Sequence, residues 1–298
     1  MIVITDSMKT LGYWIEAMRL RTLPVSVAGV LAAAAYALLH GVFNATPAVI
    51  CLIFAIMAQI ASNFANEYFD YTAGRDRPGR EGPRRGVTEG EITPQAMKKA
   101  VYITLGLAGC FGLSLVAWGG WWLLAVGVFI AVGVFAYSAG PYPLSTNGLG
   151  EVAVIFFFGI IPVNLTYYVQ AHAFTFNVFL ASVAIGLMGA NVLIINNYRD
   201  TDDDRAVGKR TLSVRYGQAA MRRLYLADAI AAAVLLLHAW IAAGPWSAAV
   251  PLAYLLLSAK VTAEMSRRSG AALTPLLGAT SMLMFGVALA LLIIFALR

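Results

Sequence analysis

Residues 66–76 read Asn-Glu-Tyr-Phe-Asp-Tyr-Thr-Ala-Gly-Arg-Asp, and residues 196–204 read Asn-Asn-Tyr-Arg-Asp-Thr-Asp-Asp-Asp. Each of these two acidic stretches stands at the polar end of a long apolar segment, and in each an Asn precedes an Asp by four residues. Side chains four residues apart share one face of an α-helix. The pairs that would share a face in this way are Asn66 with Asp70 and Asn196 with Asp200. Because most of the remaining chain is apolar, we expect the chemistry to reside in these two stretches.

The composition is typical of a membrane protein. Of the 298 residues, 60% are hydrophobic and only 12% are charged, which departs from the usual balance of soluble domains. Apolar runs near the length needed to cross a bilayer recur along the chain. Backbone buried in lipid must satisfy its own hydrogen bonds, so these runs predict helices. The expected fold class is therefore an all-α, polytopic membrane bundle.

The hydropathy pattern predicts nine transmembrane helices. Their expected ranges are 22–39, 47–66, 98–118, 121–139, 149–169, 176–197, 223–243, 246–263 and 273–297. The N-terminal stretch and alternate connectors, with their flanks, hold 20 of the 21 Lys and Arg residues, and only Arg298 lies on the other side. By the positive-inside rule, the N-terminus and both acidic stretches face the cytoplasm and the C-terminus lies outside. We therefore expect an integral protein of the cytoplasmic (inner) membrane.

The two acidic stretches also indicate an internal repeat. They begin 130 residues apart, at 66 and 196, and they follow the second and the sixth predicted helix. An interval of four helices in the same orientation predicts two parallel four-helix repeats, approximately 15–140 and 145–263, with the ninth helix outside them. The whole chain, 1–298, is expected to form a single intramembrane domain.

The remaining composition excludes several functions. The net charge of +6 does not indicate nucleic-acid binding, because the basic residues lie in loops that flank membrane helices. Cys51 and Cys110 both lie within apolar runs, which predicts buried thiols and no disulfide or metal pair. The three histidines are isolated and show no metal-ligand spacing. Residues 1–21 are too polar to supply the apolar core of a cleavable signal peptide.

The acidic stretches predict a metal site. Carboxylates and amides at the edge of a membrane are costly unless they face a cavity or bind something, although solvated loop charges are the alternative interpretation. The candidates for binding are Asn66, Asp70, Asp200 and Asp204. Hard oxygen ligands split between two places suit Mg²⁺, which combines a few carboxylates with water and substrate phosphate. Calcium lacks a spaced ligand loop here.

Basic residues close to both acidic stretches predict a diphosphate ligand. Arg binds phosphate oxygens in bidentate fashion, although the positive-inside rule accounts for part of this basic cluster. The cluster comprises Arg75, Arg80, Arg84, Arg85, Arg199, Arg205, Lys209 and Arg210. A diphosphate at the mouth of a cavity that opens to lipid suggests an isoprenyl diphosphate, whose allylic cation an aromatic face could stabilise. The candidate aromatic residues are Tyr68, Tyr71, Tyr137 and Tyr198.

At these motifs the chain resembles the UbiA superfamily of intramembrane aromatic prenyltransferases. The resemblance covers nearly the whole chain and is carried by 19–24 (Arg-Leu-Arg-Thr-Leu-Pro), 62–70, 80–86, 90–93, 148–151, 196–200, 204–205 and 208–217. The Asp-rich motifs are common to the superfamily. The Asn-Asn-Tyr-Arg-Asp run at 196–200 and the Gly-Lys-Arg-Thr-Leu-Ser-Val-Arg block at 208–215 are more particular to its naphthoate branch.

The resemblance implies a site as well as a fold. It implies a nine-helix bundle with a central cavity that opens sideways to lipid, and two Mg²⁺ ions between the motifs. By position, the metal ligands would be Asn66, Asp70, Asp200 and Asp204, with Asp76 as a further ligand. The diphosphate or the substrate carboxylate would be held by Arg80, Arg85, Arg199 and Lys209. Glu67 stands where the family commonly has Asp, so its role as ligand or support stays open.

The naphthoate branch implies a reaction. A polyprenyl group would pass from polyprenyl diphosphate to 1,4-dihydroxy-2-naphthoate with loss of CO₂ and diphosphate, giving demethylmenaquinol for menaquinone biosynthesis. The same fold with a benzoate, homogentisate, haem or chlorophyllide acceptor is an alternative. A secondary transporter is a third hypothesis. The ionisable residues cluster at one membrane face, which disfavours transport.

Overall fold

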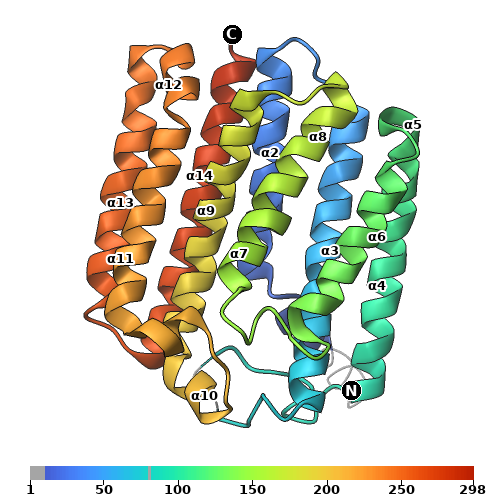
Figure 1. Ribbon diagram of the computed structural model, residues 1–298, viewed down its shortest axis with the longest axis vertical. Helices are drawn as coiled ribbons and strands as arrows, with labels where there is room; N and C mark the ends of the chain where they lie inside the picture. The colour runs from blue at the N-terminus through green and yellow to red at the C-terminus, as the bar shows by residue number, and fades with distance from the viewer. Residues whose placement is uncertain (1–10, 80–81) are drawn as a thin grey trace, which may run out of the picture.

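The computed structural model describes residues 11–79 and 82–298, and within these residues every regular element is a helix (Figure 1). The all-α prediction is confirmed. The main helices are α2 (Leu23–Leu39), α3 (Ala45–Thr72), α4 (Pro94–Ser114), α6 (Leu123–Ser138), α8 (Ile161–Ala171), α9 (Phe176–Arg199), α11 (Leu212–Leu235), α13 (Ala249–Met265) and α14 (Thr274–Ala296). The shorter segments are η1 (Leu20–Thr22), α5 (Val116–Gly119), α7 (Gly150–Val154), η2 (Ile155–Ile160), α10 (Thr201–Ala206), α12 (Leu237–Ala243), η3 (Pro245–Ala248) and η4 (Gly270–Leu273).

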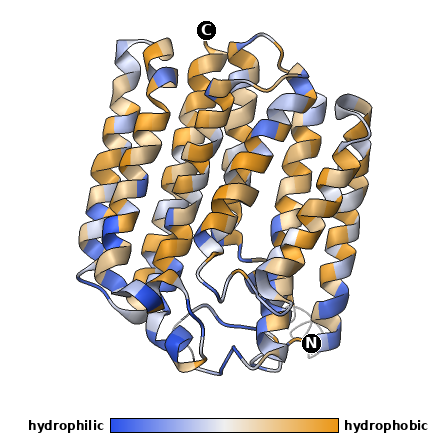
Figure 2. Cartoon of the chain, in the orientation of Figure 1, coloured by the Kyte–Doolittle hydropathy of each residue, from blue (hydrophilic) through white to orange (hydrophobic). Residues whose placement is uncertain are grey.

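In the described part of the chain, seven helices are long and apolar enough to cross a membrane. Several of them join consecutive helical segments, so their bounds are wider than those of the single helices above. They are Leu11–Leu39, Ala45–Thr72, Pro94–Gly119, Gly150–Ala171, Phe176–Arg199, Pro245–Met265 and Gly270–Ala296. The pair α11 and α12, which bends by 43°, would make an eighth span. Helix α6 is apolar but has only 16 residues. Hydrophilic residues gather at the end of the bundle that carries α10 (Figure 2).

Side-chain caps explain where several of these helices begin. The side chains of Asn44, Thr93, Thr175 and Thr211 each accept a hydrogen bond from a backbone N–H in the first turn of α3, α4, α9 and α11. Such caps satisfy donors that a helix cannot satisfy internally. Helix α3 runs six residues beyond its predicted end at 66, so the first acidic stretch is largely helical. Helix α9 ends at Arg199, and the second stretch continues into α10.

One close backbone contact fixes the centre of the bundle. Segment η2 is a single π-helical stretch that joins α7 to α8 and lies against α9. A Cβ atom on Gly159 would lie 2.4 Å from the carbonyl oxygen of Ser182 and 2.5 Å from Cα of Gly186. Only glycine permits this approach. The contact sets the distance between η2 and α9, both of which carry residues of the site described below.

The two cysteines have different surroundings. Cys51 is buried, as predicted, whereas Cys110 is exposed on α4. The prediction of a buried thiol is therefore wrong for Cys110. An apolar run does not distinguish a helix face that meets lipid from one that meets the core, because both are apolar.

Candidate functional site

The ends of α3, α9 and α10 bring the two acidic stretches to one cavity of about 160 Å³. The oxygen-bearing side chains that line it from these stretches are those of Asn66, Asp70, Asn196, Asn197, Asp200 and Asp204. Three basic side chains, Arg19, Arg85 and Lys209, line the same cavity. Residues that lie more than a hundred positions apart in the chain are therefore assembled into one charged cavity.

In the first acidic stretch, the side chain of Asn66 makes four hydrogen bonds to its neighbours. Its Oδ1 accepts hydrogen bonds from Nη2 of Arg19 at 2.7 Å and Nη2 of Arg85 at 3.4 Å. Its Nδ2 donates to Oγ of Ser138 at 3.0 Å and to Oδ2 of Asp70 at 3.3 Å. The bond between Asn66 and Asp70 shows that the spacing of four residues does place both side chains on one face of α3.

The second acidic stretch is ordered by Arg199. Its Nε and Nη2 donate to the two carboxylate oxygens of Asp200 at 2.7 and 2.9 Å, a bidentate arrangement that fixes the carboxylate. The same Nη2 donates to Oδ1 of Asn196 at 2.9 Å. The guanidinium is buried and is not among the residues that line the cavity. Arg199 therefore contacts the acidic stretch itself and holds Asp200, which lines the cavity.

Lys209 joins the two stretches. Its Nζ lies 3.3 Å from Oδ2 of Asp70 and 3.4 Å from Oδ1 of Asp204. Nε of Arg75 donates to Oδ1 of Asp70 at 3.0 Å. The carboxylates of Asp70 and Asp204 thus share one cation, the ammonium group of Lys209.

The donor set suits a divalent cation. Carboxylate and amide oxygens are the ligands that Mg²⁺ prefers, and it uses one or two carboxylates together with water and substrate phosphate. Among the residues that the structure describes, no three His, Cys, Asp or Glu side chains form a metal-binding group by themselves. A site of split carboxylates beside basic residues therefore fits a metal that shares its coordination with a phosphorylated substrate.

The other residues predicted from the sequence are dispersed. Asp76 lies beside Arg85, with Oδ2 3.6 Å from Nε, and is not part of the cavity lining. Glu67 accepts a hydrogen bond from the backbone N–H of Val87 at 3.0 Å, so it ties the loop before α4 to α3. Arg80 lies outside the described residues.

Tyr137 is the candidate aromatic residue that the structure places in the cavity lining. Tyr198 donates its hydroxyl hydrogen to the carbonyl oxygen of Met265 at 2.8 Å, which holds it in the core. Tyr71 is exposed, and Tyr68 packs edge-to-face against Phe69. These three tyrosines do not line either cavity described here.

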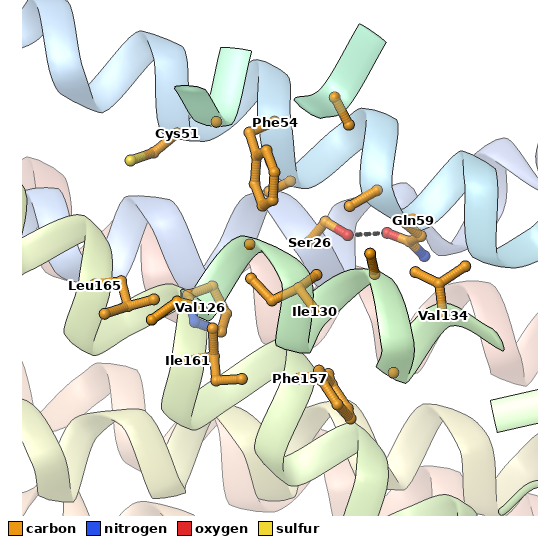
Figure 3. Close-up of a pocket in the computed structure, with 18 of the residues that line it drawn as sticks. Ser26, Cys51, Phe54, Gln59, Val126, Ile130, Val134, Phe157, Ile161 and Leu165 are labelled. Atoms are coloured by element: carbon orange, nitrogen blue, oxygen red, sulfur yellow. Dashed lines mark hydrogen bonds between the residues drawn. The ribbon is translucent and has the colours of Figure 1, made fainter. Parts of the chain in front are cut away.

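Figure 3 shows a second, apolar cavity of about 550 Å³, which shares lining residues with the charged one. It lies among α3, α4, α6, η2 and α8, and its lining includes Phe54, Val126, Ile130, Phe157, Ile161 and Leu165. Both cavities are lined by Gln59, Ser62, Tyr137, Val154 and Phe158. These five residues form the junction between the two cavities. A molecule with a charged head and an apolar tail could occupy both cavities at once.

Among the polar residues that line this region, Gln59 and Arg19 were given no role by the sequence analysis. Gln59 lies at the junction, where its Nε2 donates to the carbonyl oxygen of Thr22 at 2.8 Å and its Oε1 accepts from Ser26. Its signal was a lone amide within an apolar run, since polar groups at membrane depth are functional candidates. Arg19 was part of a quoted motif without a role, and its position just before the first span was the available signal.

Sequence comparison finds relatives along most of this chain. The model of the UbiA prenyltransferase family matches residues 25–274. A protein of Escherichia coli (strain K12) named 1,4-dihydroxy-2-naphthoate octaprenyltransferase is 39% identical over 218 residues, which cover 71% of each chain. A Mycobacterium tuberculosis protein of the same name is 35% identical over 284 residues, which cover 95% of this chain and 96% of that protein.

The fold is also similar to solved structures. The structure of a UbiA homolog from Archaeoglobus fulgidus bound to GPP and Mg²⁺ has a TM-score of 0.64 and covers 94% of this chain and 99% of that one, at 15% sequence identity. The same homolog bound to DMAPP and Mg²⁺ has a TM-score of 0.62 at 16% identity, covering 92% of this chain and 98% of that one. At such identity the likeness is one of fold.

Proposed function

This chain belongs to the UbiA prenyltransferase family, and we propose that it transfers a polyprenyl group from polyprenyl diphosphate to 1,4-dihydroxy-2-naphthoate. CO₂ and diphosphate leave, and the product is demethylmenaquinol, a precursor of menaquinone. The observation that supports this proposal most directly is the junction of a charged cavity with an apolar one. The charged cavity suits a diphosphate and the apolar cavity suits an isoprenoid tail.

In the proposed complex the diphosphate lies between the two acidic stretches. Its metal ions, which we propose are two Mg²⁺, would be held by Asn66, Asp70, Asp200 and Asp204, with Asp76 as an outer contact of Arg85. Bound Mg²⁺ would stabilise the negative charge of the departing diphosphate. Arg85 supports this position, because its Nη1 is buried without a hydrogen-bond partner among the described residues. Lys209 and Arg80 would add positive charge, whereas Arg199 would act by holding Asp200.

The polyprenyl tail lies in the apolar cavity. Along α3 the cavity runs from Ser62 to Cys51, a rise of about 17 Å at 1.5 Å per residue. At the end far from the junction, the lining residues Leu113 and Val128 are exposed on the outer faces of α4 and α6. A longer tail would therefore leave the protein there and continue in lipid.

At the junction, the bond between the allylic carbon and the diphosphate oxygen breaks, and its electron pair leaves with the diphosphate. The naphthoate ring carbon that bears the carboxylate then forms the new C–C bond. The bond to the carboxyl carbon breaks, CO₂ leaves, and its electron pair restores the aromatic ring. This sequence needs no strong general base at the attacked carbon. Tyr137 and Phe158 line both cavities, so their rings are available at the junction where the allylic cation would form.

We further propose nine membrane crossings in a single domain, 1–298, as two four-helix repeats, 15–140 and 145–263, and a last helix. The seven long spans, the bent α11–α12 pair and the short α6 supply nine segments. The concentration of Lys and Arg at the end with the acidic stretches supports a cytoplasmic N-terminus and active site, and an outer C-terminus.

The test is an assay of the purified protein with 1,4-dihydroxy-2-naphthoate, a series of polyprenyl diphosphates and Mg²⁺, with products identified by mass. We expect a prenylated product that has lost the carboxyl group. A prenylated product that retains the carboxyl group would contradict the decarboxylation. Turnover of a benzoate or homogentisate in place of the naphthoate would contradict the acceptor, and uptake into proteoliposomes without covalent change would support a transporter.

A further inference from the structure

Glu151 is a buried carboxyl group that does not line the charged cavity. It lies in the first turn of α7 and is 5% exposed. Its Oε1 accepts a hydrogen bond from Nδ2 of Asn197 at 2.9 Å, and its Oε2 is buried without a hydrogen-bond partner among the described residues. Asn197, in contrast, does line the charged cavity. The carboxyl group of Glu151 therefore contacts a cavity residue, Asn197, without lining the cavity itself.

This hydrogen bond fixes which way the amide of Asn197 faces. An Asn side chain has one nitrogen that donates and one oxygen that accepts, on opposite sides of the amide carbon. Since Nδ2 is engaged by Glu151, Oδ1 points away from Glu151. Among the residues that the structure describes, none donates a hydrogen bond to this oxygen. Asn197 therefore offers the cavity a fixed acceptor.

Two more neutral polar groups, from Tyr137 and Ser145, line the same cavity as Asn197. Oγ of Ser145 is buried and has no hydrogen-bond partner within the described ranges. A Cβ atom added to Gly150, the neighbour of Glu151, would lie 3.7 Å from the hydroxyl oxygen of Tyr137 and 3.9 Å from Cα of Ser145. The start of α7 thus gathers three neutral groups, from Tyr137, Ser145 and Asn197, which we name the neutral wall. Since Tyr137 also lines the apolar cavity, the neutral wall reaches the junction.

We propose that the neutral wall binds the aromatic acceptor through its hydroxyl groups, with Oδ1 of Asn197 accepting a hydrogen bond from one of them. This inference rests on the proposed function and names the acceptor side of the same site. Phosphate oxygens need donors, and the free atom of Asn197 is an acceptor, so it does not suit the diphosphate. A hydroxyl that donates to a carbonyl oxygen makes its ring richer in electrons and so a better nucleophile. Glu151 is a positioning residue, because it acts by orienting Asn197.

The test compares Glu151→Gln, Asn197→Ala and the double variant in steady-state kinetics. The amide introduced by Glu151→Gln can donate as well as accept, so it no longer dictates the orientation of the Asn197 amide. We expect each single variant to raise the KM for the naphthoate or lower its kcat/KM by about tenfold, the effect of one hydrogen bond. The KM for the polyprenyl diphosphate and the Mg²⁺ concentration for half-maximal activity should each stay within about twofold of the wild-type value. The double variant should be no worse than Asn197→Ala, because two residues that act through one contact are not additive.

The matched control is Asn191→Ala. Asn191 is also a buried Asn of α9 with an unpartnered Oδ1, but it donates to the backbone of Tyr225 and lies outside both cavity linings. We expect its naphthoate KM to equal that of the wild type. Asn197→Leu, which keeps the side-chain volume, repeats the test if Asn197→Ala lowers the unfolding temperature.

Three results would overturn the inference. One is an unchanged naphthoate KM and kcat/KM in Glu151→Gln and in both Asn197 variants. Another is additive losses in the double variant. The third is a raised Mg²⁺ requirement with an unchanged naphthoate KM, which would assign Asn197 to the metal. Absence of naphthoate turnover in the wild type would instead refute the proposed function and with it this assignment, so the two failures are distinguishable.

Discussion

Lys209 is the residue on which the charge balance of the cavity depends. Its ammonium group is shared by the buried carboxylates of Asp70 and Asp204. Lys209→Met leaves the two carboxylates without this shared cation, and losing one partner of a buried ion pair is strongly destabilising. We predict a lower unfolding temperature in metal-free detergent solution, with most of the loss recovered by Mg²⁺, and at least a tenfold higher KM for the polyprenyl diphosphate.

The control for this prediction is Lys260→Met, because Lys260 is exposed on α13 and does not line the cavity. Thermal unfolding with and without Mg²⁺ measures the effect. If Mg²⁺ stabilised the wild type and Lys209→Met to the same extent, Lys209 and the metal ion would not be competing for the same carboxylates.

At the residue scale, part of the site could be read from the sequence. Asn66 and Asp70 stand out because oxygen ligands at the end of an apolar helix are costly unless they bind something. Glu151 carried a signal, since it is a carboxyl group at the start of a predicted span, but its contact with Asn197 depends on how α7 packs against α9. Arg199 could be placed near the site, but a sequence does not show that a guanidinium binds its neighbouring carboxylate, Asp200, instead of a substrate.

Segment η2 is the element whose geometry the site depends on most. It carries Phe157 and Phe158 into the apolar cavity, and Gly159 holds it against Gly186 of α9. Gly159→Ala introduces a methyl group where backbone atoms lie within 2.6 Å of its position. We predict a loss of about 1–3 kcal/mol in the free energy of unfolding, because overpacking forces backbone shifts.

Thermal or denaturant unfolding in detergent checks this prediction. The matched control is Gly286→Ala in α14, where an added Cβ meets nothing within 4 Å. That variant should be as stable as the wild type or slightly more stable, since Ala favours helix more than Gly does. Equal stability of both variants would mean that η2 can move away from α9.

At the scale of single helices, the sequence predicted which helices exist better than it predicted where they bend. The runs predicted at 47–66 and 176–197 correspond to α3 and α9, because long apolar segments with polar ends are a strong pattern. The run predicted at 223–243 is instead a bent pair that starts at Leu212. Hydropathy averages over a window, so it detects neither this bend nor the π-helical stretch η2.

At the scale of the whole molecule, the two cavities determine how much of the polyprenyl diphosphate the protein contacts. The apolar cavity extends about 17 Å along α3, which holds roughly three to four isoprene units of about 5 Å each. We predict that kcat/KM rises with donor length up to about four units and then changes little, because the remaining tail lies in lipid. A series of donors from two to ten units measures this.

A blocking variant sharpens the test. Ala55 lines the apolar cavity on α3, about one turn from Gln59 at the junction. Ala55→Phe should move the plateau to shorter donors while leaving the naphthoate KM unchanged. A steady rise in kcat/KM through the longest donors, with no effect of Ala55→Phe, would mean that the tail takes another route.

The central claim is that the two acidic stretches form one site for the diphosphate. Its most direct test is the rate of diphosphate release by Asp70→Asn and Asp200→Asn at saturating Mg²⁺, beside Asp202→Asn. The side chain of Asp202 is 92% exposed and pairs with Arg205, so it belongs to the same stretch without facing the cavity. We predict a loss of about 100-fold or more in turnover for Asp70→Asn and Asp200→Asn, and wild-type turnover for Asp202→Asn. Near-normal turnover of either cavity variant would contradict the account.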